Sequence, residues 1–139
     1  MKHIKKIFFI VTVIFICVVI FFAAMNKEHE NHFKSITLSD NYQRISYLNL
    51  QGLDVIEISE ETIRLPEKFE GIYNDYLIVQ QKQKLPLEEY KGKTVRRYLY
   101  EIKNYNQENV LAELLIYNNT LIAAAKIHQS QSGFIQGIY

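Results

Sequence analysis

The sequence has little that could support redox or nucleophilic chemistry. Its 139 residues contain a single cysteine, Cys17, so no intramolecular disulfide can form. No stretch has the residue spacing of a known catalytic, metal or cofactor site, and we therefore expect neither a cofactor nor a catalytic centre. With 48% hydrophobic residues, the chain has the length and composition of one domain held together by its core.

A strong charge of either sign is also absent. Lys2, Lys5 and Lys6 precede the first apolar run, so 13 of the 16 Lys and Arg residues remain beyond it to balance 15 Asp and Glu. Binding to nucleic acid through its phosphates needs a concentrated positive field. The slightly acidic body therefore predicts no nucleic-acid partner.

One long apolar run is present, "IFFIVTVIFICVVIFFAAM", which covers residues 7–25. As a helix it would extend about 28 Å, close to the hydrocarbon core of a bilayer. It is longer than the apolar part of a cleaved signal peptide, and Phe22 and Met25 stand where a cleavage site needs small residues. The run predicts a retained single-pass anchor in the cell membrane, with the basic start in the cytoplasm and the rest of the chain outside.

We divide the chain into three parts on this basis. Residues 1–25 form the cytoplasmic basic start and transmembrane anchor, residues 26–37 a stalk, and residues 38–139 an extracytoplasmic domain. His29 and His32 lie three residues apart in the stalk. Two imidazoles without a rigid surrounding shell make a weak metal site, so we expect a solvated stalk and no metal.

The domain begins with a predicted short helix. Ser39 or Asp40 can cap its start, and Gly52 suits the left-handed position that ends a helix. The β-branched and charged residues of 55–65 then predict a strand. The apolar positions of the helix, three residues apart, are Tyr42, Ile45 and Leu48.

A second helix is predicted to begin at Pro66, since proline is tolerated in the first helical turn. It would run to about Lys84, because Pro86 disfavours helical conformation in the residue before it. Its apolar positions follow one helical stripe, which we interpret as core. They are Phe69, Ile72, Tyr73, Tyr76 and Leu77.

Asn118 and Asn119 predict a two-residue turn between antiparallel strands, since asparagine accepts positive φ. In that register one face is entirely apolar and the other is mixed. The apolar face pairs Ile116 with Leu121, Leu114 with Ala123, Ala112 with Ala125, and Val110 with Ile127. The mixed face pairs Tyr117 with Thr120, Leu115 with Ile122, Glu113 with Ala124, and Leu111 with Lys126.

The stretch "YKGKTVRRYLYEIKNY", residues 90–105, places basic residues among aromatic ones. Such a mixture fits either a base-stacking surface or a strand with one apolar side. Tyr98, Tyr100 and Ile102 alternate with charged residues, which favours the strand. We expect these three beside Ile116, Leu114 and Ala112, beneath the second helix, with Arg97 in an exposed ion pair.

Together these elements predict an α+β domain behind an N-terminal transmembrane helix. Two helices would pack on an antiparallel sheet whose C-terminal part is a three-stranded meander.

Three blocks of the chain resemble DUF4830, a family of uncharacterised, membrane-anchored bacterial domains found mainly in Firmicutes. The resemblance covers about residues 44–138. It is carried by "RISYLNLQGLDV", by "LPEKFEGIYNDYLIVQQKQKLPLEEYKGKTVRRYLYEIKNY", and by "AELLIYNNTLIAAA" with the closing "SGFIQGI". It implies the order of elements and a membrane context, and it implies no catalytic residues.

The chain departs from the family pattern at two places. Ala124, Ala125 and Lys126 stand where the family usually has Gly-Gly-Asp. Leu53 and Lys84 stand where it usually has Trp and Gly.

For function, the sequence favours a non-catalytic binding or accessory module. Small sheets expose edge strands that can accept an added strand, so we expect a peptide or protein partner. The alternative is a hydrolase with a site near His128, which has Ser130 and Ser132 close in sequence. Glu88 and Glu89 are adjacent and need not converge as a catalytic carboxylate pair must.

Overall fold

The structure is a computed structural model, and it describes residues 15–18, 33–130 and 133–139. Residues 15–18 are helical. The rest of the predicted anchor, and residues 26–32 of the predicted stalk with His29 and His32, lie outside the described residues. Within the described part of the chain, no helix is long and apolar enough to cross a membrane.

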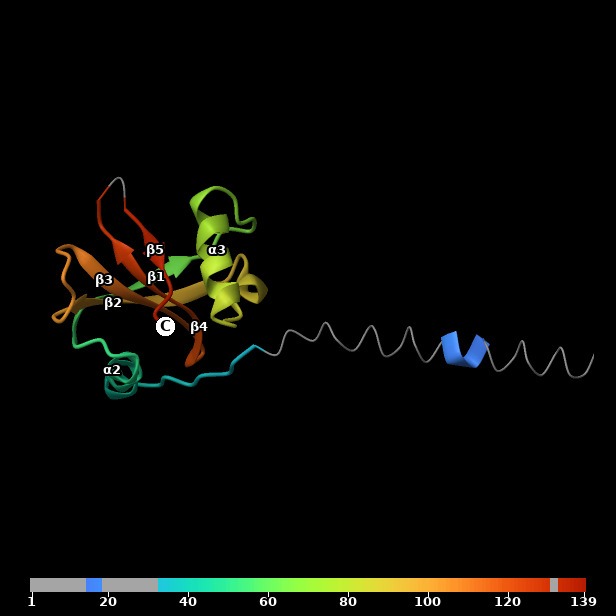
Figure 1. The fold of residues 1–139 in the computed structure, drawn as a ribbon, viewed down its shortest axis with the longest axis horizontal. Helices are drawn as coiled ribbons and strands as arrows, with labels where there is room; N and C mark the ends of the chain where they lie inside the picture. Colours follow the sequence, from blue (N-terminus) through green and yellow to red (C-terminus); the bar gives the residue numbers. More distant parts are fainter. Residues whose placement is uncertain (1–14, 19–32, 131–132) are drawn as a thin grey trace, which may run out of the picture. The chain divides into compact units, whose positions relative to one another are not determined.

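Phe33–Tyr139 form one structural unit of the α+β class (Figure 1). Its five strands make a single antiparallel sheet in the order β1-β2-β3-β4-β5, and β2, β3 and β4 form the predicted meander. The elements are α2 (Asn41–Leu50), β1 (Val55–Arg64), α3 (Ile72–Lys82), the short 3-10 helix η1 (Leu87–Tyr90), β2 (Thr94–Ile102), β3 (Val110–Tyr117), β4 (Thr120–His128) and β5 (Ile135–Gln136).

The sheet is buried on both of its faces. On one face, which we call the α2 face, Tyr47 and Leu48 of α2 belong to a core cluster with Tyr98, Tyr100 and Leu114. The α3 face carries a second cluster, in which Tyr76 and Leu77 of α3 pack with Val95, Leu115 and Ile122. Because β3 contributes to both clusters, every residue from Val110 to Ile116 is buried.

The predicted first helix is confirmed at both ends. Asp40 is its N-cap and accepts a hydrogen bond from the N–H of Gln43 at 2.8 Å. Gly52 follows its end with φ of 81°. The predicted apolar side is wrong in part, because Tyr42 is 80% exposed and the helix buries Arg44, Tyr47 and Leu48.

The predicted strand at residues 55–65 is confirmed as β1, but the second helix does not begin at Pro66. The carbonyl of Pro66 accepts a hydrogen bond from the N–H of Gly92, and the N–H of Leu65 donates to Lys93, which keeps this segment extended. Gly71, with φ of 56°, then sets the start of α3 at Ile72.

The turn at Asn118 and Asn119 is confirmed, with positive φ at both residues. The predicted register holds for Tyr117–Thr120 and Ile116–Leu121, and it is wrong beyond them. A bulge leaves Ile122 without a partner, so each later pair is shifted by one residue. The observed pairs are Leu115 with Ala123, Leu114 with Ala124, Glu113 with Ala125, Ala112 with Lys126, Leu111 with Ile127, and Val110 with His128.

Tyr98, Tyr100 and Ile102 lie on an apolar face, as predicted, but two details of that prediction are wrong. Tyr98 pairs with Leu114 and Tyr100 with Ala112, a shift of two residues that preserves the face. The helix that covers this face is α2, whereas α3 packs on the opposite face. The base-stacking reading needed an exposed Tyr98 and Tyr100, and both are buried.

Candidate functional site

Gln80 of α3 and Gln83, the residue that caps the end of α3, cover the backbone in the middle of β4. Oε1 of Gln80 accepts a hydrogen bond from the N–H of Ala124 at 2.9 Å, and Nε2 of Gln83 donates to the carbonyl of Ala124 at 2.7 Å. Oε1 of Gln83 also accepts a hydrogen bond from the N–H of Ile138 at 2.6 Å. The two side-chain amides thus satisfy backbone groups that a neighbouring strand would otherwise satisfy.

The two ends of β4 are covered by other segments. At its start, the N–H of Leu121 donates to the carbonyl of Ile36 at 2.8 Å, and Thr37 forms a bridge with Thr120. At its end, β4 pairs with β5. Ala124 therefore lies at the centre of a covered edge.

The opposite edge of the sheet is β1, which pairs with β2 and has no other neighbouring strand among the described residues. Ile56 and Ile58 of β1 are 53% and 50% exposed. The pairing with β2 is interrupted at Ile58, which lies in a bulge between Glu57 and Ser59. An edge strand with exposed apolar side chains can accept a strand from another chain.

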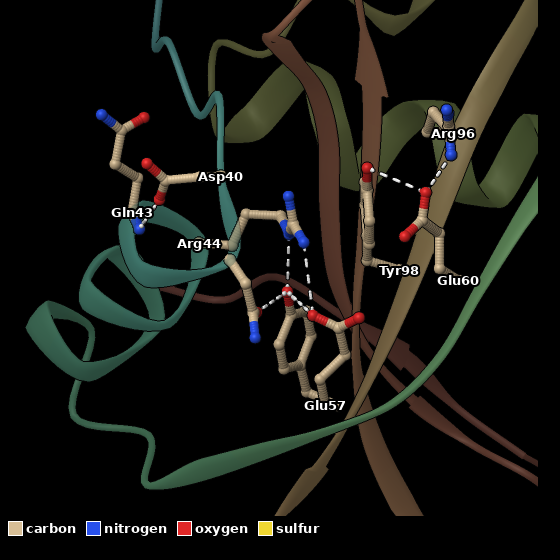
Figure 2. Close-up of polar contacts among 9 residues, drawn as sticks. Asp40, Gln43, Arg44, Glu57, Glu60, Arg96 and Tyr98 are labelled. Atoms are coloured by element: carbon tan, nitrogen blue, oxygen red, sulfur yellow. Dashed lines mark hydrogen bonds and ion pairs between the residues drawn. The ribbon is translucent and has the colours of Figure 1, made fainter.

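Beneath β1, on the α2 face, Arg44 is held by three groups at once (Figure 2). Its guanidinium carbon lies 3.7 Å from the centre of the Tyr98 ring. Its Nε donates to the hydroxyl of Tyr100 at 2.8 Å, and a terminal nitrogen pairs with Glu57 at 3.3 Å. Burial raises the pKa of Tyr100, and the contact with Arg44 opposes that rise. This cluster ties α2 to β1 and β2.

On the α3 face, Arg97 pairs with two carboxylates: the expected exposed ion pair is present with Glu61, and a second, partly buried pair is present with Glu113. Its Nη1 lies 2.7 Å from Glu61, and its Nε pairs with Glu113. The side chains of Arg97 and Glu113 are 28% and 8% exposed, respectively. Burial lowers the pKa of Arg97, but the charge of Glu113 and the hydrogen bonds to both carboxylates raise it, with a net increase.

A cavity of about 360 Å³ lies between α3 and the sheet, and we call it the α3 pocket. Tyr76, Arg97 and Glu113 contribute the polar groups at its lining, together with Arg64. The hydroxyl of Tyr76 is closed off from solvent and interacts with the carboxylate of Glu113. Burial raises the pKa of Tyr76, and the charge of Glu113 raises it further, so the hydroxyl stays protonated. The apolar lining includes Ile63, Leu65, Leu87, Leu115, Ile127 and Ile135.

His128, near which the alternative hydrolase site was predicted, is the last residue of β4. Nδ1 of His128 accepts a hydrogen bond from the backbone N–H of Ser130 at 3.2 Å, and the ring packs on Phe134 with centroids 5.6 Å apart. Ser132 lies outside the described residues. These contacts occupy one ring nitrogen of His128 and give the ring a structural role.

Glu88 and Glu89 both lie in η1, and each contact found for Glu88 is an exposed one, to Gln81 and Lys91. Over the described ranges, no three His, Cys, Asp or Glu side chains are grouped as a metal site would require.

No protein-family model, curated protein or solved structure matches this chain. The resemblance to DUF4830 accordingly stays a prediction.

The residues that distinguish the two edges and define the pocket were not predicted from the sequence. Gln80 in α3 and Gln83 at its C-cap are three residues apart, beyond the buried Tyr76 and Leu77, and this spacing places them on the side that meets the sheet. Glu113 is the one charged residue in β3. A lone carboxylate in a strand of apolar residues indicates a buried ion pair, and this signal was available in the sequence.

Proposed function

We propose that the protein is a single-pass membrane protein whose body lies outside the cell membrane and binds a peptide or protein partner without catalysing a reaction. The partner would add a strand to β1. The anchor in this proposal is the apolar run of residues 7–25, and the orientation follows from Lys2, Lys5 and Lys6 on the cytoplasmic side.

The difference between the two sheet edges is the observation that supports a binding role. β4 is covered at its start, middle and end by Ile36, by Gln80 with Gln83, and by β5. β1 is longer than β5, exposes Ile56 and Ile58, and pairs with no strand other than β2 in the part of the chain that the structure describes. Strand addition would satisfy the outer backbone groups of β1, and the two isoleucines would give the added strand apolar contacts.

Site-specific photo-crosslinking in intact cells tests this proposal. A photoreactive residue placed at Ile56 or Ile58 should form a discrete adduct, and one placed at Tyr42 or Leu50 should not. The control positions are apolar and at least as exposed, at 80% and 83%, but they lie on α2. Protease added to intact protoplasts should remove the adduct together with the body.

A charge at the edge sharpens the experiment. Ile58→Lys should abolish the adduct formed from Ile56, because a charged side chain on an edge strand opposes pairing. Leu50→Lys adds the same charge on α2 and should leave the adduct unchanged. Adducts of equal yield from β1 and α2, or none from β1, would exclude strand addition at this edge.

A further inference from the structure

The α3 pocket continues from the β1 edge, where the proposed partner strand would pair. Ile63 and Arg64 of β1 line it, as does Leu65 directly after them, and this end of β1 lies next to α3 (Figure 1). The rim of the pocket is exposed, because Ile72 and Tyr73 of α3 are 68% and 43% exposed. A side chain that comes from beyond β1 therefore has a way into the pocket.

Strand geometry directs one set of side chains toward this rim. Ile63 pairs with Val95, a member of the cluster on the α3 face, so Ile63 points to α3 and its neighbour Thr62 points to the other face. In an antiparallel strand added to β1, the residue opposite Ile63 would point to the same face, with the two Cβ atoms about 5 Å apart. That residue would stand at the rim, beside Ile72 and Tyr73.

The wall that such a side chain would meet is apolar. Isoleucine and leucine side chains form most of it, and they come from β3, β4, β5 and η1 as well as from β1. The polar groups of the lining already have partners. Arg97 pairs with two carboxylates, and the hydroxyl of Tyr76 is closed off from solvent and interacts with Glu113. Arg64 pairs with Glu67 in water, where their side chains are 71% and 73% exposed.

In strand addition, backbone hydrogen bonds supply the affinity, and pockets for alternate side chains supply the specificity. We infer that the strand that pairs with β1 carries a large apolar residue, such as leucine, isoleucine or phenylalanine, opposite Ile63, and that this side chain occupies the α3 pocket. The inference rests on the proposed function, and it adds the feature by which the partner is selected.

Synthetic strand peptides that differ at one position test the inference. Their sequence is acetyl-Lys-Val-Thr-Val-X-Val-Thr-Val-Lys-amide, where X is Phe, Ala or Glu. The nearest residues on the same face as X are threonines, so X alone offers that face a large apolar side chain. The full-length chain in lipid nanodiscs carries a photoreactive residue at Ile56, and the yield of adduct against peptide concentration gives the affinity of each peptide.

The Phe peptide should bind at least about tenfold more tightly than the Ala peptide, because it removes a large apolar side chain from water. The Glu peptide should bind no more tightly than the Ala peptide, since the wall of the pocket is apolar.

A second photoreactive position locates X. Placed at Ile72, at the rim of the pocket, it should form an adduct with the Phe peptide at X itself. Placed at Ile78, which is 42% exposed on α3 and does not line the pocket, it should not.

Filling the pocket should remove the selection and leave the edge in place. Ile63→Trp adds a large side chain on the α3 face of β1 and should reduce the preference for Phe over Ala to less than about twofold. Thr62→Trp is the matched control, because Thr62 is the exposed neighbour on the opposite face of the same strand. It should leave the preference unchanged, and circular dichroism verifies that both variants are folded.

Equal affinity for the Phe and Ala peptides would overturn the inference, and so would a Glu peptide that binds as tightly as the Phe peptide, which would assign the selection to Arg64. A preference for Phe that persists in Ile63→Trp, or an adduct from Ile78 equal to that from Ile72, would also overturn it. In each of these cases the adducts from Ile56 still support strand addition. Absence of adducts with every peptide would overturn strand addition at β1, and the inference with it.

Discussion

Each face of the sheet carries an arginine held in ion pairs, and the two arginines have different surroundings. On the α2 face, the ring of Tyr98, the hydroxyl of Tyr100 and the carboxylate of Glu57 surround Arg44. On the α3 face, Arg97 pairs with Glu61 and Glu113 and lines a cavity together with Tyr76. The charged groups of the α2 face are thus enclosed by their partners, whereas those of the α3 face border a cavity.

Neighbouring leucines of β3 provide the largest expected contrast. Leu114 lies in the α2 face cluster and is fully buried, so Leu114→Ala should lower the free energy of unfolding by about 4 kcal/mol. Leu115 is also buried but lines the α3 pocket, where part of its surface already lacks contacts. Leu115→Ala should cost about 2 kcal/mol. Urea denaturation followed by circular dichroism measures both, and equal losses would contradict the contrast between the faces.

The two arginines give the next contrast. Arg44→Ala should lower the free energy of unfolding by about 3 kcal/mol, because it removes the ion pair of Glu57 and the contact with the Tyr98 ring. Arg97→Ala should lower the free energy of unfolding by about 2 kcal/mol. Arg97 is more exposed than Arg44, but its removal leaves the buried carboxylate of Glu113 without an ion-pair partner. Adding Glu113→Gln to Arg97→Ala should restore part of that loss. A double variant less stable than Arg97→Ala would show that the buried charge of Glu113 is not the cause.

The smallest effect is expected at the surface of the α3 side. Lys91 hydrogen-bonds Glu88 and lowers its pKa below the ordinary 4.5, although Glu88 is 47% exposed. A lowered folded-state pKa stabilises the fold above the unfolded pKa, and that contribution disappears as pH falls through the folded value. Glu88→Gln should therefore reduce stability at pH 7 by at most about 0.5 kcal/mol, and this effect should disappear as the pH is lowered through the folded-state pKa of Glu88. Denaturation midpoints of the wild type and Glu88→Gln at neutral and acidic pH measure this effect, and a loss at pH 7 well above this limit would contradict the prediction.

Local signals in the sequence predicted several elements correctly. Asp40 and Gly52 mark the ends of α2, and Asn118 with Asn119 marks the turn between β3 and β4, because each of these residues has a backbone preference that few others share. The alternation around Tyr98 and Tyr100 predicted the apolar face of β2.

The remaining features depend on contacts between distant segments. β3 is buried on both faces, so its pattern does not indicate which helix covers which face. The bulge at Ile122 shifts the register between β3 and β4, and no glycine at this position indicates a bulge in the sequence. The start of α3 is set after two hydrogen bonds, from the N–H of Gly92 to the carbonyl of Pro66 and from the N–H of Leu65 to the carbonyl of Lys93, and both join residues more than twenty positions apart. The α3 pocket needs all of these features in place, so its polar residues could not be grouped beforehand.

The two glutamines that cover β4 also affect how the chain reaches its fold. Gln80 and Gln83 are synthesised more than forty residues before the backbone of Ala124 that they contact. Until α3 docks, the middle of β4 is an unprotected edge that another copy of the chain can join. We expect the docking of α3 to be the step at which correct folding competes with aggregation, and substitutions at these glutamines to lower the yield of soluble protein more than they lower the stability of the protein that folds.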